Sequence, residues 1–186
     1  YGVNQISDVA DRSGFRIVGA SDNDANGGST RFIFQKGGHI PAISIGSRTK
    51  MREWRALSMT IERQCLELVM YLQEQRNAGK IMWGYGASTK GNVVLQRAGI
   101  GTALLSKILD VNPDKEGCVT PGTHIPIRTT PLHSAERSPD IMLVLPWHFR
   151  DFIVEKERAF LEGGGELVFE IPQLDIVTKT GSRRTA

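Results

Sequence analysis

The sequence contains few cysteines and no long apolar run, and both absences narrow what the protein can be. Its two cysteines, Cys65 and Cys118, lie far apart and match neither a metal-binding spacing nor a CxxC motif, so we expect no metal site. Reduced thiols are the default in the cytosol, and we therefore expect a cytoplasmic protein. The longest apolar runs, such as residues 141–147, are far too short to span a bilayer, which argues against a membrane protein.

Charge of one sign does not dominate either. Lysine and arginine number 23 against 20 for aspartate and glutamate, and the basic residues do not interleave with aromatic ones, which argues against a nucleic-acid partner. What remains is an ordinary globular composition, 40% apolar and 23% charged, in 186 residues that suffice for one domain plus a fragment of another. Because the chain starts at Tyr1 in a segment typical of the middle of a domain, we expect a piece of a longer protein.

The first part of the chain predicts a small helix and hairpin followed by one long helix. A helix is expected over residues 4–13, and two alternating segments, 14–21 and 31–36, predict paired strands. Residues 37–46 predict a loop or a short strand. From residue 47 to 78, apolar side chains recur at steps of three and four, which predicts an amphipathic helix. These apolar side chains are Trp54, Leu57, Ile61, Cys65, Leu68 and Leu72.

From residue 81 onward, segments typical of strands alternate with segments typical of helices. This alternation predicts an α/β fold, with a Rossmann-like parallel sheet covered by helices on both faces. The expected strands are 81–85, 107–111, 141–145 and 166–171, and the expected helices are 89–98 and 149–161.

The segment IMWGYGASTKGN, residues 81–92, places glycines directly after the first strand of this sheet. Glycines at such a turn let backbone N–H groups and a helix N-terminus approach an anion, so the loop is a candidate phosphate site. Its third glycine is off register for the dinucleotide fingerprint, and a tight strand-to-helix turn remains the alternative. The candidate residues are Gly84, Gly86, Ser88, Lys90, Gly91 and Asn92.

A second group of polar residues follows the next predicted strands, at the sheet edge where open parallel sheets bind ligands. Asp110 suits a ribose-binding carboxylate, and it equally suits a cap of the turn that follows. His124 taken alone is more often structural, and Trp147 suits either stacking on a ligand or packing over the sheet. We expect this group to line the same cleft as the glycine loop: Asp110, Asn112, Lys115, Thr120, Thr123, His124 and Trp147.

Several segments, in this order and at these separations, resemble one known family. They are GYGASTKGN, LDVNPDKEG, TPGTHIPI, PDIMLVLPWHFRDFIVEKE and GGGELVFEIP. Residues 47–172 are similar to the carboxyl-terminal domain of S-adenosylmethionine-dependent C-methyltransferases that methylate nucleotide-linked deoxysugars. Residues 1–36 resemble the last helix and strands of that family's catalytic domain.

The resemblance implies a longer enzyme with a zinc-binding module, a methyltransferase domain and this carboxyl-terminal domain. Residues 1–46 would be the end of the methyltransferase domain and a linker, 47–175 the Rossmann-like domain and 176–186 a tail. S-adenosylmethionine would be bound mostly by the missing domain, so we expect no cofactor here and no turnover by this chain alone. The expected partners are a nucleotide sugar, or a related small molecule, and the missing methyltransferase domain.

One position departs from the family pattern. Where sugar-methylating members carry His-Gly-Gly, with the histidine as the expected base, this chain has Asn26-Gly27-Gly28, so we assign no catalytic residue. Asparagine cannot shuttle a proton near neutral pH. A base from the missing part, an acceptor acidic enough to need none, and a different reaction remain open, as does a purely structural turn at Asn26.

Two other function classes remain open. A non-catalytic nucleotide-binding module, for example one that uses NAD, would need the glycine loop and Asp110 to hold a pyrophosphate and a ribose. A structural or dimerisation domain would use the apolar stripe of the helix at 47–78 as its interface. A dimer that depends on concentration would favour this second class.

Overall fold

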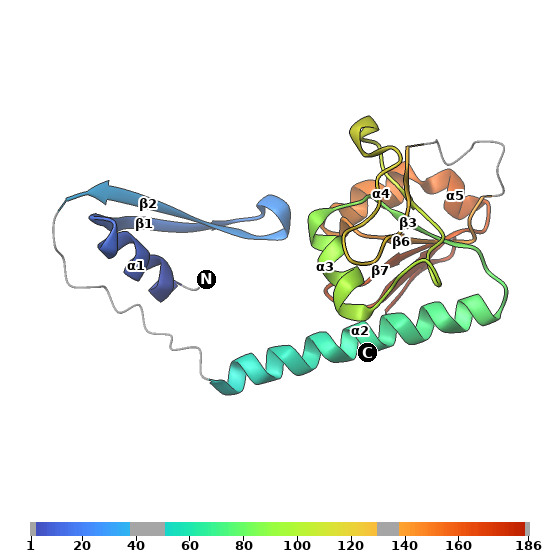
Figure 1. The fold of residues 1–186 in the computed structure, drawn as a ribbon, viewed down its shortest axis with the longest axis horizontal. Coiled ribbons are helices and arrows are strands. Elements are labelled where there is room, and N and C mark those ends of the chain that lie inside the picture. The colour runs from blue at the N-terminus through green and yellow to red at the C-terminus, as the bar shows by residue number, and fades with distance from the viewer. Residues whose placement is uncertain (1–2, 38–50, 130–137, 185–186) are drawn as a thin grey trace. The chain divides into compact units, whose positions relative to one another are not determined.

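The computed structural model describes residues 3–37, 51–129 and 138–184 (Figure 1). The loop or strand expected at 37–46 and the start of the helix expected from residue 47 therefore lie almost wholly outside the described residues. The chain divides into two compact units, Tyr1–Ala56 and Leu57–Ala186, which are considered separately below.

The first unit is a short helix packed on a hairpin, as the sequence predicted. Helix α1 (Val3–Arg12) leads into strand β1 (Phe15–Asn23), the turn η1 (Ala25–Gly27) and strand β2 (Ser29–Lys36). The two strands pair antiparallel from Phe15↔Lys36 to Asn23↔Ser29. Ala10 is buried, whereas Ile33 and Phe34 stay exposed on the hairpin. A two-stranded sheet therefore buries little apolar surface by itself.

Helix α2 (Met51–Asn77) confirms the long helix, but only part of its apolar stripe is covered. Leu68 and Leu72, in the C-terminal half, are buried in the core of the second unit. Leu57 and Ile61, from the same predicted stripe, are exposed. The helix ends before Gly79, whose φ of 79° suits a left-handed helix terminus.

The second unit is built around one mixed sheet of seven strands in the order β5-β4-β3-β6-β7-β8-β9. Five neighbouring strands of this order, β5, β4, β3, β6 and β7, are parallel. Strands β8 and β9 extend the sheet antiparallel at one edge. The strands are β3 (Met82–Tyr85), β4 (Ile108–Leu109), β5 (Ile127–Arg128), β6 (Ile141–Val144), β7 (Glu166–Phe169), β8 (Asp175–Thr178) and β9 (Gly181–Arg184).

Helices cover both faces of this sheet, which confirms the predicted Rossmann-like architecture (Figure 1). Alternate residues of β6 show the two faces: Ile141 and Leu143 belong to the core beneath α2 and α3, and Met142 and Val144 belong to the core beneath α4 and α5. The helical segments are α3 (Thr89–Ala98), η2 (Pro113–Lys115), η3 (Trp147–Phe149), α4 (Arg150–Lys156) and α5 (Arg158–Glu162).

Three segments differ from the sequence-based expectation, and the first is β5 at 127–128, where no strand was expected. The helix expected at 149–161 is interrupted at Glu157, which separates α4 from α5 and turns its carboxylate toward Tyr85. Residues 176–184, expected to lie in a tail, instead form most of β8 and all of β9. Buried Asp175 anchors this edge, since it accepts hydrogen bonds from Arg150 and Ser182.

Candidate functional site

A cleft of about 1010 Å³ opens at the carboxyl ends of β3, β4 and β6. The chain leaves β3 for β4 on one side and later enters β6 on the other, so this edge is a topological switch point. Open α/β sheets bind ligands at such points. The lining residues of this switch-point cleft come from the glycine loop, the ends of β4 and β6, and α4, and they include Gly86, Ser88, Asp110, Lys115, Phe149 and Phe152.

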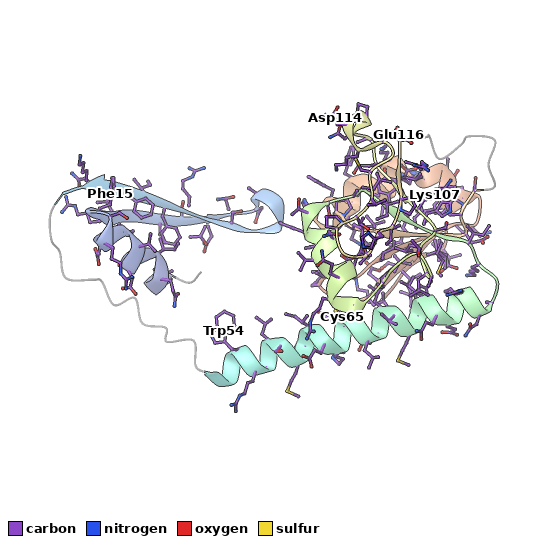
Figure 2. The ribbon with its side chains drawn as sticks, viewed as in Figure 1. Phe15, Trp54, Cys65, Lys107, Asp114 and Glu116 are labelled. Carbon is purple, nitrogen blue, oxygen red and sulfur yellow. The ribbon has the colours of Figure 1, made fainter. Side chains whose placement is uncertain are left out.

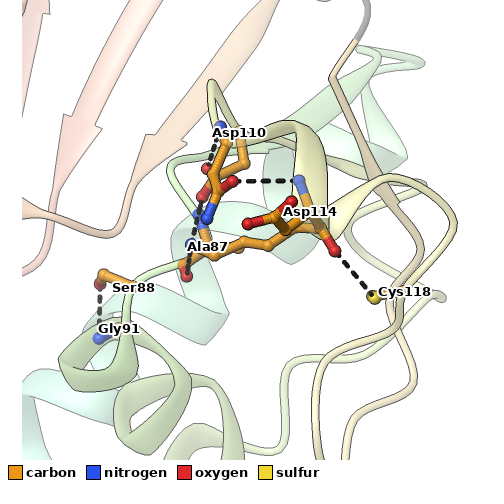
Figure 3. A network of polar contacts seen from close by, with 8 residues as sticks. Ala87, Ser88, Gly91, Asp110, Asp114 and Cys118 are labelled. Atoms are coloured by element: carbon orange, nitrogen blue, oxygen red, sulfur yellow. Dashed lines mark hydrogen bonds and ion pairs between the residues drawn. The ribbon is translucent and has the colours of Figure 1, made fainter.

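Asp110 is the polar centre of one wall (Figure 3). Its carboxylate accepts hydrogen bonds from the Ala87 N–H at 2.7 Å, the Asn112 N–H at 2.8 Å and the Lys115 ammonium at 2.9 Å. Burial alone would raise the pKa of Asp110, but these three donors outweigh it and lower the pKa below its ordinary value. Asp110 therefore stays ionised and holds the glycine loop to the end of β4.

The glycines of the loop are required by close packing. A Cβ on Gly84 would lie 2.6 Å from Ile108, and a Cβ on Gly91 would lie 2.3 Å from Leu145. Gly86 has a φ of 77°, and a Cβ on it would lie 2.8 Å from the Pro146 ring. The tight strand-to-helix turn, which the sequence left open, thus accounts for all three glycines.

Ser88 completes this turn, since its hydroxyl caps α3 by accepting the Gly91 N–H at 3.0 Å. The Ala87 N–H, which would otherwise face an anion, is already bound to Asp110. A phosphate at this turn would therefore meet an ionised carboxylate.

The opposite wall carries a polar cluster that the sequence reasoning missed. The Tyr85 hydroxyl donates to the Glu157 carboxylate at 2.7 Å, and the Lys156 ammonium donates to the Tyr85 oxygen at 2.9 Å. Burial, and then the hydrogen bond to Glu157, raise the pKa of Tyr85. The available signal was Tyr85 itself, the last residue of a strand whose carboxyl end faces the predicted ligand edge.

Two aromatic side chains of this cleft remain open to solvent. Phe149 is 53% exposed and Phe152 is 67% exposed, both beside the paired polar groups. Exposed aromatic rings in a cleft are suited to stack on a flat ring of a ligand. The switch-point cleft therefore combines two exposed aromatic rings with carboxylates that are paired with lysines.

The other predicted site residues are divided among different places. Lys90 and Trp147 line a separate cleft of about 400 Å³, with the Lys90 ammonium 6.0 Å from the centre of the Trp147 ring. Asn92 and Thr120 line a smaller pocket of about 260 Å³, which Ser88 and Lys115 also border. The structure thus brings Gly86, Ser88, Asp110 and Lys115 together in the large cleft, and does not bring Lys90 or Trp147 there.

Three further predicted residues hold turns. The Thr123 and Thr120 hydroxyl oxygens lie 2.6 Å apart, and Thr120 also accepts the Ile125 N–H. His124 adopts a φ of 54° in the same turn. The Asn112 side chain caps η2 by accepting an N–H at 3.0 Å. Thr123, His124 and Asn112 line none of the three cavities described above.

The structure bears only in part on three further expectations, which concern Asn26, a metal site and a membrane span. Asn26 lies in η1 between the strands of the hairpin, and the prediction about its side chain lies outside what the structure describes. In the described ranges, His, Cys, Asp and Glu side chains form no group of three or more that could hold a metal. Among the helices described, none has the length and apolar character needed to cross a membrane.

Comparison with known proteins matches this chain to a protein family and to a curated protein. The model of a family described as the C-methyltransferase C-terminal domain matches residues 45–172, which contain the switch-point cleft. The chain is also 28% identical to the C-methyltransferase NovU of Streptomyces niveus, over an alignment of 193 residues that covers 96% of this chain. That alignment covers 45% of NovU, so the chain spans less than half the length of this curated relative.

Proposed function

The chain belongs to the C-methyltransferase C-terminal domain family, as its motifs predicted, and from this premise we propose that it is the substrate-binding part of a cytoplasmic S-adenosylmethionine-dependent C-methyltransferase. The proposed acceptor is a nucleotide-linked keto sugar or a related small molecule. The observation that carries this proposal is the switch-point cleft, which lies within the residues that the family model matches.

The walls of the cleft suit such an acceptor. Sugar hydroxyls both donate and accept hydrogen bonds, and the Lys156 ammonium and the Glu157 carboxylate, beside Tyr85, offer both kinds of partner. The rings of Phe149 and Phe152 offer a stacking surface for a nucleobase or a sugar face.

The cofactor is proposed to bind outside this chain. In Rossmann-type nucleotide sites, a carboxylate at the end of the second strand commonly binds ribose hydroxyls. Here the corresponding Asp110 already accepts three hydrogen bonds, and Gly84 and Gly91 are closed off by Ile108 and Leu145. These residues do not fit an adenosyl group, which supports a cofactor site in the remainder of a longer enzyme.

Calorimetric titration of the chain with a thymidine-diphosphate sugar tests this proposal, with S-adenosylmethionine and NAD as parallel ligands. The sugar nucleotide should bind, and Phe152→Ala should weaken its binding by about tenfold through lost stacking. The matched control is Leu66→Ala, because Leu66 is also largely exposed on a helix and lines none of the three cavities.

Three outcomes would contradict the proposal. Equal weakening by Phe152→Ala and Leu66→Ala would remove α4 from the binding surface. Binding of NAD in place of the sugar nucleotide would favour the nucleotide-binding module. If none of the three ligands gave measurable heat of binding, this chain alone would not bind the acceptor.

A further inference from the structure

A second cleft lies between α2, α3 and the segment that follows β7. Its volume is about 400 Å³, within the range of small-ligand pockets. We call it the α2–α3 cleft. Figure 2 marks Cys65 on α2, one of its wall residues. Its lining is mostly apolar, and the residues are Ile61, Gln64, Cys65, Leu68, Lys90, Val93, Val94, Arg97, Trp147, Glu170 and Ile171.

Glu170 is the unusual member of this lining. It is 4% exposed, and neither carboxyl oxygen has a hydrogen-bond partner among the residues that the structure describes. The other buried acids differ, since Glu157 accepts from Tyr85 and Asp175 from Arg150. Burying a carboxyl group without a partner costs several kcal/mol, so its retention in a cleft points to a group that is bound there.

At neutral pH this carboxyl group is a hydrogen-bond donor. Burial raises the pKa of Glu170 to about 8, and the backbone N–H of the same residue offsets this only in part. Near pH 7 the group is therefore mainly protonated, with one O–H to donate and one oxygen to accept.

The remaining charges of the cleft are positive. Burial raises the pKa of Cys65, with a further rise from Glu170 and a lowering by Arg97, so its thiol is neutral. Lys90 and Arg97 are cations, and Arg97 pairs with Glu62, outside the lining, at 2.7 Å. Burial, and then Lys90, lower the pKa of His148, the neighbour of Trp147. An organic cation would face two positive groups here, whereas an anion would be attracted by them.

We propose that the α2–α3 cleft binds a small amphiphilic organic anion, such as an alkyl or aryl carboxylate. Its carboxylate accepts the Glu170 O–H, a charge-assisted hydrogen bond of the stronger kind. Its apolar part packs against Ile61, Val93 and Val94. The positive charges of Lys90 and Arg97 attract the carboxylate, although Arg97 is shared with Glu62. This cleft shares no lining residue with the switch-point cleft, so the proposal does not depend on the proposed acceptor site.

Titration of the chain with octanoate, followed by calorimetry near pH 7 and near pH 9, tests the proposal. Octanoate should saturate one site, and its affinity should fall by about tenfold near pH 9, because one pH unit above the pKa of Glu170 leaves about one-tenth of it protonated. Octylamine is the matched ligand of opposite charge and should show no saturable binding. Saturable binding of octylamine, rising with pH, would overturn the assignment.

Two pairs of measurements place the ligand in this cleft. Val93→Glu adds a negative charge to the lining at an exposed position and should weaken octanoate by at least about tenfold. Val119→Glu, at an exposed residue outside the cleft, should leave the affinity unchanged. Octanoate should also slow alkylation of Cys65 without slowing that of exposed Cys118. Equal effects within either pair would overturn the proposal.

The role of Glu170 is tested by Glu170→Gln. The glutamine amide still donates to a carboxylate but does not titrate, so octanoate should bind with the same affinity near pH 7 and near pH 9. A tenfold fall that persists in this variant would show that another group controls the pH dependence, which would contradict the role of Glu170.

Discussion

At the scale of single residues, the glycine loop shows that one sequence pattern can have two physical causes, the approach of a ligand and close packing within the protein. The sequence predicted a turn that approaches an anion, and the structure explains each glycine by its neighbours: Ile108 for Gly84, Pro146 for Gly86 and Leu145 for Gly91. Glycine spacing reports only that side chains are not tolerated. It does not reveal whether a ligand or the protein's own packing excludes them.

Gly91→Ala tests this packing requirement. An added Cβ would lie 2.3 Å from the Leu145 Cβ, so either α3 or the segment that directly follows β6 must shift. We expect the free energy of unfolding to fall by about 1–3 kcal/mol, although alanine is the better helix former. Urea unfolding followed by circular dichroism measures it.

Gly101→Ala is the control for that change. Its nearest non-neighbouring atom is the Thr123 carbonyl oxygen, 3.5 Å from the added Cβ, which is an ordinary contact. We expect its unfolding free energy to stay within about 1 kcal/mol of the parent chain. Equal losses at Gly91 and Gly101 would show that close packing is not what Gly91 provides.

At the scale of elements, sequence periodicity predicted the existence of helices and strands better than their surroundings. The helix at 89–98 has the bounds that the pattern predicted, whereas the segment at 149–161 breaks at Glu157. At the break, Glu157 accepts a hydrogen bond from Tyr85, 72 positions away in the chain, and no local pattern contains such a contact. Strands β8 and β9 were missed because short strands with polar residues lack a marked alternation.

The stripe of α2 gives the element-scale prediction. Leu72 is 0% exposed and Leu57 is 49% exposed, although the sequence placed both on one apolar face. Leu72→Ala should lower the free energy of unfolding by about 2–5 kcal/mol, because it leaves a cavity in the core. Leu57→Ala should cost less than about 1 kcal/mol in the same urea experiment.

A large cost for Leu57→Ala would contradict this reading of α2. If that cost also grew with protein concentration, the exposed half of the helix would be an interface between copies. This result would favour the dimerisation alternative that the sequence left open.

At the scale of the whole molecule, the sequence predicted the α/β architecture and a cleft at the carboxyl ends of the strands, but not which side chains line that cleft. Strand order follows from connectivity rules, so the switch point after Tyr85 could be anticipated. Which side chains meet there depends on the path of the connecting segments. The turn at Thr123 and His124 closes on itself, while Lys156 and Phe152 line the cleft from α4, which is far from the loop in the sequence.

The two units should also differ in stability within one chain. The sheet of the first unit has two strands and leaves Ile33 and Phe34 exposed, whereas β6 in the second unit is buried throughout. Local opening is easiest where few apolar groups are buried. In hydrogen exchange followed by mass spectrometry, amides of β1 and β2 should exchange at least about 100-fold faster than those of β3 and β6. Similar protection in both units would contradict this prediction, because it would mean that the hairpin is stabilised as strongly as the Rossmann-like sheet.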